Sequence, residues 1–232
     1  SIRIRPVNNG ADQETSEVLM GIIRHIQDNS NASIAYDTAV EWQVDSGLGY
    51  IRVRNDWASP TSFDQEIYID RIVDPFKVYF DPHSIQPDGS DAEWAIYAEE
   101  IPREEFKRLY PDAELTNWDD GANGDMQGWF TQDIVRIAEY YYIEHEEEEI
   151  FDDATGMSRM ADRRKCMWCK VTGSQVLERT ELPTKYIPIV PVLGHEVWIQ
   201  GRRHLSGLVR NAKDAQRIYN YYLSANAESV AL

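Results

Sequence analysis

Cysteine and long apolar runs are both scarce in this sequence. Only Cys166 and Cys169 occur among the 232 residues, in the stretch RKCMWCK, and no further Cys or His stands at a suitable spacing nearby. Because a structural zinc site usually takes four ligands, these two residues do not make one. No apolar run approaches the roughly 20 residues that a membrane-spanning helix needs. We therefore expect neither a zinc module nor a membrane partner.

The spacing of the two cysteines leaves a redox motif as an alternative. Redox CxxC motifs normally lie where a strand meets the N-terminus of a helix. Here the run continues into VTGSQVLER, so that residues 163–181 resemble a hairpin. Residues three apart on a strand point to opposite sides of the sheet. We expect two structural thiols.

Catalytic motifs are missing as well. The five histidines are scattered, and the sequence contains no HExxH, GxSxG, GxxxxGKS/T or GxGxxG. Those patterns serve metalloproteases, serine hydrolases, phosphate-binding loops and dinucleotide-binding folds. We expect no enzymatic activity, no catalytic residue and no cofactor.

Two acidic clusters keep a metal-dependent hydrolase open as an alternative function. The stretch DPHSIQPDGSDAEW places Asp81, Asp88, Asp91 and Glu93 in one loop. Carboxylates bind calcium, but this spacing does not fit the calcium-binding loop, and Asp-Pro and Asp-Gly are ordinary turn sequences. The run EHEEEE at 144–149 ends a strand, where neighbouring side chains diverge. We expect a turn and a solvated strand edge, and no metal site.

Basic residues are outnumbered, since 23 Lys and Arg stand against 40 Asp and Glu for a net charge of −17. Affinity for phosphate comes from Lys and Arg that displace counterions, so an acidic surface repels nucleic acid as a whole. The charge does not exclude a role in which DNA contacts the protein without being bound tightly. An acidic surface that serves only to keep the protein soluble is the alternative, and the sequence does not distinguish the two.

The patterns that are present predict an α+β fold with largely antiparallel strands. Helical spacing predicts helices over 14–30, from about 31 to 44, and over 101–111, where Pro102 suits the first helical position. Strand patterns occur between 50 and 99, and then over 133–149, 163–181 and 188–194. Residues 112–132 are acidic, Gly-rich and unpatterned, which is typical of a long surface loop.

The last stretch, SGLVRNAKDAQRIYNYYLSANAESVAL, predicts a helix over 206–232 that no Gly, Pro or turn cluster closes. The first residue is Ser1 and not Met. Together the two ends suggest a piece cut from a longer protein. A processed native chain with a frayed last helix is the alternative.

This last helix has two unlike faces. Its apolar face, with residues spaced by four and three, consists of Leu208, Ala212, Ala215, Tyr219 and Tyr222. Its cationic face, about half a turn away, consists of Arg210, Lys213 and Arg217. Such a helix either packs into a core with one solvated side, or contacts a neighbour with one face and an anion with the other.

Several segments together resemble the portal proteins of short-tailed, podovirus-type bacteriophages. They run in the family's order and cover nearly the whole chain. The segments are EVLMGIIRHIQDNSNASIAYDTA, DPFKVYFDPHSIQPDGSDAEWA, PREEFKRLYP, VRIAEYYYIE, IPIVPVLG and RRHLSGLVRNAKDAQRIYNYYLSANAE. None of them is a catalytic signature, so the resemblance rests on their order and on the distinctive last segment.

The resemblance implies a structural role. Portal proteins form a ring, usually a dodecamer, at the single capsid vertex through which the genome passes. The implied partners are other copies of the chain, terminase, tail adaptor proteins, capsid and scaffolding proteins, and double-stranded DNA in transit without sequence specificity. The implied locations are the virion and, during assembly, the host cytoplasm. Residues 1–205 would form a mixed, wing-type body with N-terminal helices, and residues 206–232 the truncated start of a long helix that leads to the stem.

The resemblance also suggests roles for the last helix. Twelve copies at −17 each would carry roughly −200, so that DNA slides through an acidic ring without sticking. Arg210, Lys213 and Arg217 would contact DNA phosphates or pair with Glu of the next subunit, and the apolar face would be an assembly face. Another phage head-tail adaptor remains an alternative.

Overall fold

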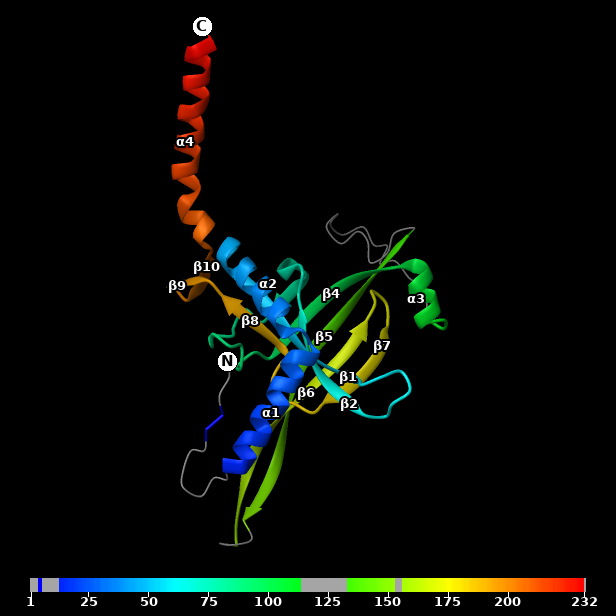
Figure 1. The fold of residues 1–232 in the computed structure, drawn as a ribbon. Coiled ribbons are helices and arrows are strands. Elements are labelled where there is room, and N and C mark those ends of the chain that lie inside the picture. Colours follow the sequence, from blue (N-terminus) through cyan, green and yellow to red (C-terminus); the bar gives the residue numbers. More distant parts are fainter. Residues whose placement is uncertain (1–3, 6–12, 114–132, 153–155, 232) are drawn as a thin grey trace. The chain divides into compact units, whose positions relative to one another are not determined.

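A computed structural model describes residues 4–5, 13–113, 133–152 and 156–231 of the chain (Figure 1). The described residues divide into two compact units. One unit combines residues 1–75 with 189–232, and the other comprises residues 76–188. The predicted boundary after residue 205 lies where helix α4 begins, but the start of a helix is not in itself a domain boundary. That boundary stays a prediction.

Two helices begin the first unit. Helix α1 (Gln13–Asn29) and helix α2 (Ala32–Asp45) confirm the two predicted helices. Asn31 separates them in the left-handed conformation, with φ of 48°. The turn is held to the neighbouring sheet by the Ser30 hydroxyl, which accepts a hydrogen bond from the Ile69 N–H at 3.0 Å.

The sheet of the first unit has the strand order β2-β1-β8, with both pairings antiparallel. Its strands are β1 (Leu48–Trp57), β2 (Gln65–Arg71) and β8 (Ile189–Leu193). Helix α2 turns Ala32, Ala35 and Ala39 inward, where all three are buried. Because these side chains are small, α2 lies so close to β1 that a Cβ on Gly49 would overlap the carbonyl of Ala39. β8 pairs with β1 although more than a hundred residues separate the two strands in the sequence, and this pairing completes the sheet of the first unit.

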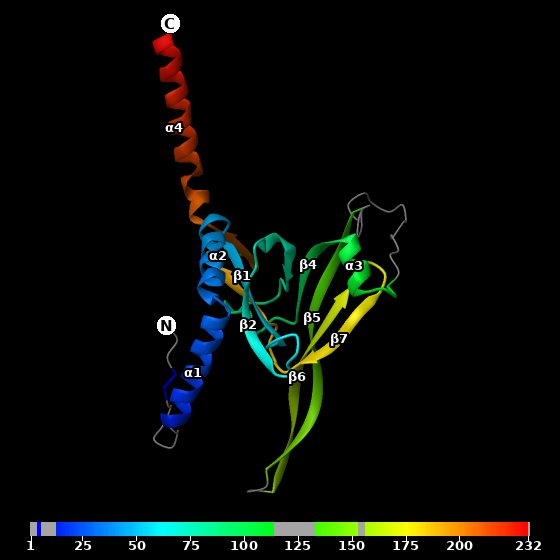
Figure 2. The ribbon, with the colours of Figure 1, turned by 45° about the vertical axis from the view of Figure 1, so that its right-hand side comes forward.

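A hairpin and the last helix follow. Strands β9 (His195–Ile199) and β10 (Arg202–Ser206) are paired antiparallel across a turn in which Gln200 and Gly201 both have positive φ. Helix α4 (Leu208–Ala231) then confirms the predicted last helix. Figures 1 and 2 show α4, in red, leaving the end of β10 beside the C-terminal end of α2.

The second unit is built on a five-stranded antiparallel sheet of order β3-β4-β5-β6-β7. A short 3-10 turn (Pro75–Lys77) leads into it. Its strands are β3 (Val78–Phe80), β4 (Trp94–Pro102), β5 (Ile134–Asp152), β6 (Met157–Val171) and β7 (Val176–Leu182). The strand patterns and the α+β class are confirmed, and every pairing in the described sheets is antiparallel.

The core of this unit lies under helix α3 (Arg103–Leu109). Phe106 of α3 is fully buried against Val135 and Ile137 of β5. Pro102, which we predicted at the first helical position, instead precedes the helix with ψ of 140°. Because β4 pairs through Pro102, that residue keeps an extended backbone, and the helix begins one residue later. Most of the predicted loop at 112–132 lies outside the described residues.

Strands β5 and β6 continue beyond the rest of their sheet as a two-stranded arm. β4 pairs with β5 only as far as Tyr142, and β7 pairs with β6 only from Cys166 onward. Residues 144–152 and 157–165 therefore pair only with each other, and we call them the ribbon. Figures 1 and 2 show it in olive green, reaching past the other strands of its unit. The predicted hairpin at 163–181 is thus part of a longer antiparallel meander.

Candidate assembly face and other candidate sites

Helix α4 starts from a joint made of glycine backbones. A Cβ on Gly207 would lie 2.5 Å from the carbonyl oxygen of Asp45, at the end of α2. A Cβ on Gly47 would lie 2.5 Å from the carbonyl carbon of Ser206, and one on Gly194 would lie 2.8 Å from the Cα of Gly47. Real Cβ atoms do not approach other atoms this closely. Three chain segments therefore meet with no room for side chains, and this contact fixes where α4 begins.

Hydrogen bonds hold the same joint. The N–H of Gly194 donates to the carbonyl oxygen of Gly47 at 2.8 Å. The side-chain amide of Gln43 donates to the carbonyl oxygen of Leu193 at 2.6 Å, which ties α2 to the end of β8. This joint was not predicted from the sequence. Its only signal was a set of glycines at the ends of elements, where glycine also serves ordinary turns and helix caps.

The predicted apolar face lies on α4 and is uncovered within the single chain. At 100° per residue, an α-helix places the five predicted residues on one side. Leu208, Tyr219 and Tyr222 are 68%, 58% and 63% exposed. Ala212 and Ala215 are exposed as well. The described chain buries none of this face, so its role as an assembly face stays a prediction.

The predicted cationic residues lie on the other side of α4. Arg210, Lys213 and Arg217 are exposed, and Arg217 lies 3.6 Å from the carboxylate of Asp214 one turn earlier. An exposed ion pair of this kind contributes at most about 1 kcal/mol, so it does not withhold Arg217 from another anion. Their contact with DNA or with a neighbouring subunit is likewise untested.

Four further large apolar residues of α4 are exposed and were not predicted from the sequence: Val209, Ile218, Tyr221 and Leu223. Ile218 and Leu223 flank the apolar face and widen it, while Tyr221 lies toward the cationic side. The ring of Tyr221 meets that of Tyr222 edge-on, with centroids 6.0 Å apart. A search restricted to steps of three and four from Leu208 leaves these residues out. The same periodicity, extended by one position to each side, would have found Ile218 and Leu223.

The acidic loop after β3 binds its own backbone. Asp91 accepts hydrogen bonds from the buried Ser84 hydroxyl and from the Ile85 N–H, both at 2.6 Å. Asp81 accepts from the N–H groups of His83 and Glu93, at 2.9 and 3.0 Å. The two carboxylates thus accept hydrogen bonds within the turns of this loop. Such turns were predicted here from the sequence in place of a calcium site. Within the described ranges, no His, Cys, Asp and Glu side chains form a group suited to a metal ion.

These contacts affect the acidity of Asp91. Burial by itself raises the pKa of that carboxyl. The hydrogen bonds from Ser84, Ile85 and Gln86 oppose burial and outweigh it, so the pKa of Asp91 lies below its ordinary value. The charged form is therefore the one that holds the loop together.

Three of the five glutamates in the acidic run at 144–149 form ion pairs. Glu144 pairs with Arg179 at 2.9 Å, Glu146 with Lys165, and Glu148 with Arg163 at 3.3 Å. The run is exposed, as predicted for a solvated edge, but it lies opposite β6, so it is a paired strand and not a free edge. Alternation along β5 keeps the carboxylates from converging.

His145 lies between two carboxylates. Its Nδ1 is 2.7 Å from an oxygen of Asp162 on β6, and its Nε2 is 3.0 Å from an oxygen of Glu93, the residue before β4. Hydrogen bonds to Glu93 and then Asp162 raise the pKa of His145, because only the protonated ring donates to both. The imidazole thus links the ribbon to the acidic loop.

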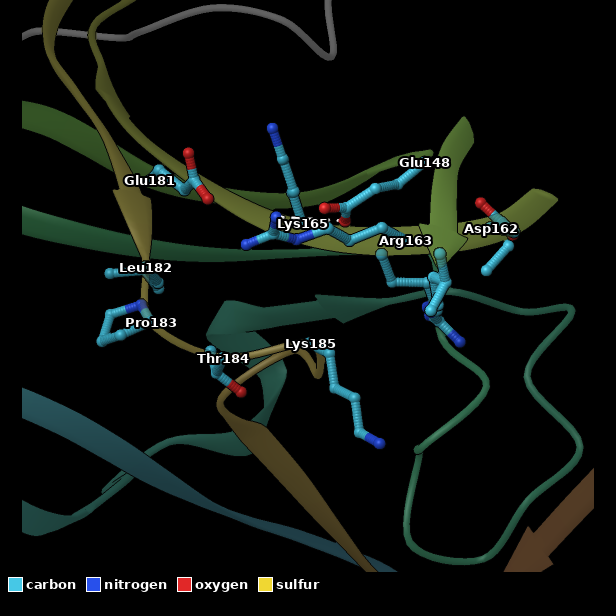
Figure 3. A pocket seen from close by; sticks show the side chains of 12 residues that line it. Glu148, Asp162, Arg163, Lys165, Glu181, Leu182, Pro183, Thr184 and Lys185 are labelled. Atoms are coloured by element: carbon cyan, nitrogen blue, oxygen red, sulfur yellow. Dashed lines mark hydrogen bonds and ion pairs between the residues drawn. The ribbon is translucent and has the colours of Figure 1, made fainter. Parts of the chain in front are cut away.

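A shallow groove runs between the ribbon and residues 182–185 (Figure 3). It encloses about 740 Å³. Arg163 and Lys165 of β6, Glu148 of β5 and Lys185 line it. Arg163 and Lys165 pair with Glu148 and Glu146, whereas Lys185 has no carboxylate partner among the described residues.

Both cysteines are free and buried. Burial raises the pKa of the Cys166 thiol to about 11, which keeps it protonated and unreactive at neutral pH. The prediction of two structural thiols agrees with this. No helix among the described residues is long and apolar enough to cross a bilayer.

The comparisons with known proteins point to one family. A sequence model of the phage P22-like portal protein matches residues 1–232. The portal protein of Acyrthosiphon pisum secondary endosymbiont phage 1 is 26% identical over 262 aligned positions. The alignment covers 99% of this chain but only 36% of that relative, so the chain spans about a third of the relative's length. Neither match supports a separate adaptor or a hydrolase. The chain belongs to the P22-like portal protein family, which is a structural family.

Proposed function

We propose that this chain is part of a structural subunit of a phage portal, a closed homo-oligomeric ring at the unique capsid vertex. The observation that carries the proposal is the family match over all 232 residues. The ring would contain about twelve copies and provide the conduit for genome packaging and ejection. It would also provide the platform that docks terminase, tail adaptors, capsid and scaffolding proteins, first in the host cytoplasm and then in the virion.

Helix α4 supports the proposal because its apolar face has no partner within the described chain. A stripe of Leu and Tyr in water is unfavourable at about 25 cal/mol per Å² of apolar surface. In a ring, each copy of the helix would lie beside the next, and that face would be covered. We assign Leu208, Ala212, Ala215, Tyr219 and Tyr222 to this contact, and residues 206–232 to the start of the stem.

The charge distribution supports passage of DNA without tight binding. The chain carries −17, so a ring of it repels phosphate as a whole. Arg210, Lys213 and Arg217 would then provide a few phosphate contacts that carry no sequence information. In this proposal the chain itself performs no catalysis and needs no cofactor.

Negative-stain electron microscopy of the full-length polypeptide that carries this sequence tests the proposal. Closed rings with a central hole are expected. Light scattering on the same sample should give one mass, close to an integral multiple of the protomer. Particles without a hole, or a monodisperse monomer at micromolar concentration, would refute the proposed function.

A further inference from the structure

The ribbon has two faces of different charge. Partners in the β5–β6 register share a face, and faces alternate along each strand. Glu147 and Glu149 therefore point to one face, which we call the acidic face. Among the described residues, neither has a basic side chain within ion-pair distance, and both are exposed. The acidic face thus presents uncompensated negative charge.

The opposite face is the one that lines the groove of Figure 3. Its three glutamates, at 144, 146 and 148, are each paired with a cation. Arg159, opposite Ile150, and Lys185, across the groove, are exposed and have no carboxylate partner in the part of the chain that the structure describes. The groove face therefore presents two cations without carboxylate partners beside its paired charges, with Glu181 on the other wall of the groove, although the chain as a whole is strongly acidic.

Apolar side chains accompany the charges on both faces. Phe151 and Met160 lie on the acidic face, and Ile150 and Met157 on the groove face. Phe151 is 61% exposed and Met157 is 71% exposed. Each face thus combines an apolar end with a charged middle, and the two charges are opposite. The two faces are complementary when the two ribbons point in the same direction, because the apolar ends then meet each other and the opposite charges meet each other.

We propose that the acidic face of one copy's ribbon docks against the groove face of the next copy. The inference rests on the proposed ring, because it names the second copy as the partner. A contact between two different faces is heterologous, and heterologous contacts are the kind that close a ring. Glu147 and Glu149 would meet Arg159 and Lys185, while the apolar ends would cover each other. Complementary charge of this kind sets partner choice and register.

Charge reversal on both sides tests the contact in the full-length polypeptide. Glu147→Lys/Glu149→Lys should weaken ring assembly at least tenfold, and Arg159→Glu/Lys185→Glu should do the same. Combining all four changes should restore assembly, because the charges are exchanged across the contact. The matched control is Asp37→Lys/Glu41→Lys, which changes the same charge on the exposed side of α2 and should assemble like wild type.

Disulfide cross-linking gives a second readout. Glu149 and Arg159 lie on opposite faces, so Glu149→Cys/Arg159→Cys does not form a bond within one ribbon. Oxidation should therefore produce a ladder of covalent oligomers up to the size of the ring. Glu149→Cys alone should produce none. Dimers of that single variant would show that two acidic faces meet and would overturn the proposal.

The failures of this inference and of the proposed function are distinguishable. If the wild-type polypeptide forms no ring, the proposed function fails. If wild type forms rings, and the charge variants form them equally well without cross-linked ladders, only the ribbon contact is wrong. If the variants form normal rings that no longer enter capsids, the surface meets a capsid protein, and the contact between copies is overturned.

Discussion

A Cβ atom on Gly207 would lie 2.5 Å from the carbonyl oxygen of Asp45. This pair of residues joins the residue that precedes α4 to the last residue of α2. Because the contact is between backbones, neither partner can move aside as a flexible side chain would. The direction of α4 is thus set by α2 and by the glycine joint, before any neighbouring subunit is considered.

Gly207→Ala is expected to destabilise the chain by about 1–3 kcal/mol, since the added methyl group has to displace backbone atoms. Chemical denaturation checks the free energy of unfolding. Gly21→Ala is the matched control, because a Cβ there meets nothing within 4 Å. It lies inside α1, where alanine should stabilise the helix by about 0.5–1 kcal/mol. Equal changes in the free energy of unfolding for Gly207→Ala and Gly21→Ala would contradict the tight backbone contact at Gly207.

Asp91→Ala is expected to cost about 1–3 kcal/mol of stability, because the buried Ser84 hydroxyl would lose its acceptor. Asp88→Ala, on the exposed part of the same loop, removes a hydrogen bond from the Ser90 N–H and should destabilise the chain less than Asp91→Ala, because Asp88 holds no buried donor. Calcium should leave the melting temperature of the wild type unchanged. A rise in melting temperature with calcium, abolished by Asp91→Ala, would show a cation site instead.

The link through His145 predicts a pH dependence. Glu93 and Asp162 raise the pKa of His145, so its contribution to stability is complete below the unfolded value of about 6.5. The contribution is lost as the pH rises through the higher folded pKa. The stability difference between wild type and His145→Gln should therefore be largest below about pH 6.5 and decline as the pH rises above that value.

The measurement for His145 is denaturation at several pH values, with His25→Gln on the exposed side of α1 as control. The His25→Gln variant keeps the His145 contacts, so its stability should follow the same pH dependence as that of the wild type. A stability difference for His145→Gln that grows with pH would contradict the assignment of a protonated bridging imidazole.

The cationic side of α4 predicts a salt-dependent contact with DNA. Replacing Arg210, Lys213 and Arg217 by Gln in assembled rings should lower the affinity for double-stranded DNA at low salt. The slope of log affinity against log salt should fall by about 1 for each lost phosphate contact. If the rings instead dissociate while DNA affinity is unchanged, these residues pair with glutamates of the next subunit.

The local elements were predictable from the sequence because their signals are local. Helical spacing identified α1, α2 and α4, and alternation identified the strands from β1 to β8. Turn chemistry in the acidic loop was likewise predictable from Asp-Pro and Asp-Gly, and Asp81 and Asp88 both accept a hydrogen bond from the N–H two residues later.

Contacts between distant residues were not predictable. Nothing in the local pattern shows that Ile189 to Leu193 return to pair with β1, or that Gly47, Gly194 and Gly207 meet. The bridge of His145 to Asp162 depends on the β5–β6 register, and its bond to Glu93 depends on the position of a third strand. A single sequence records residue types at these positions but not which of them become neighbours.

The central claim is that the apolar face of α4 is held between copies in a closed ring. Sedimentation velocity on the full-length polypeptide tests it most directly, with Tyr219→Asp/Tyr222→Asp compared with Tyr221→Asp toward the cationic side. Wild type and Tyr221→Asp should sediment as one large species of ring mass. The double variant should shift to protomers, because two carboxylates would be buried without partners. Undiminished rings in the double variant would contradict the account.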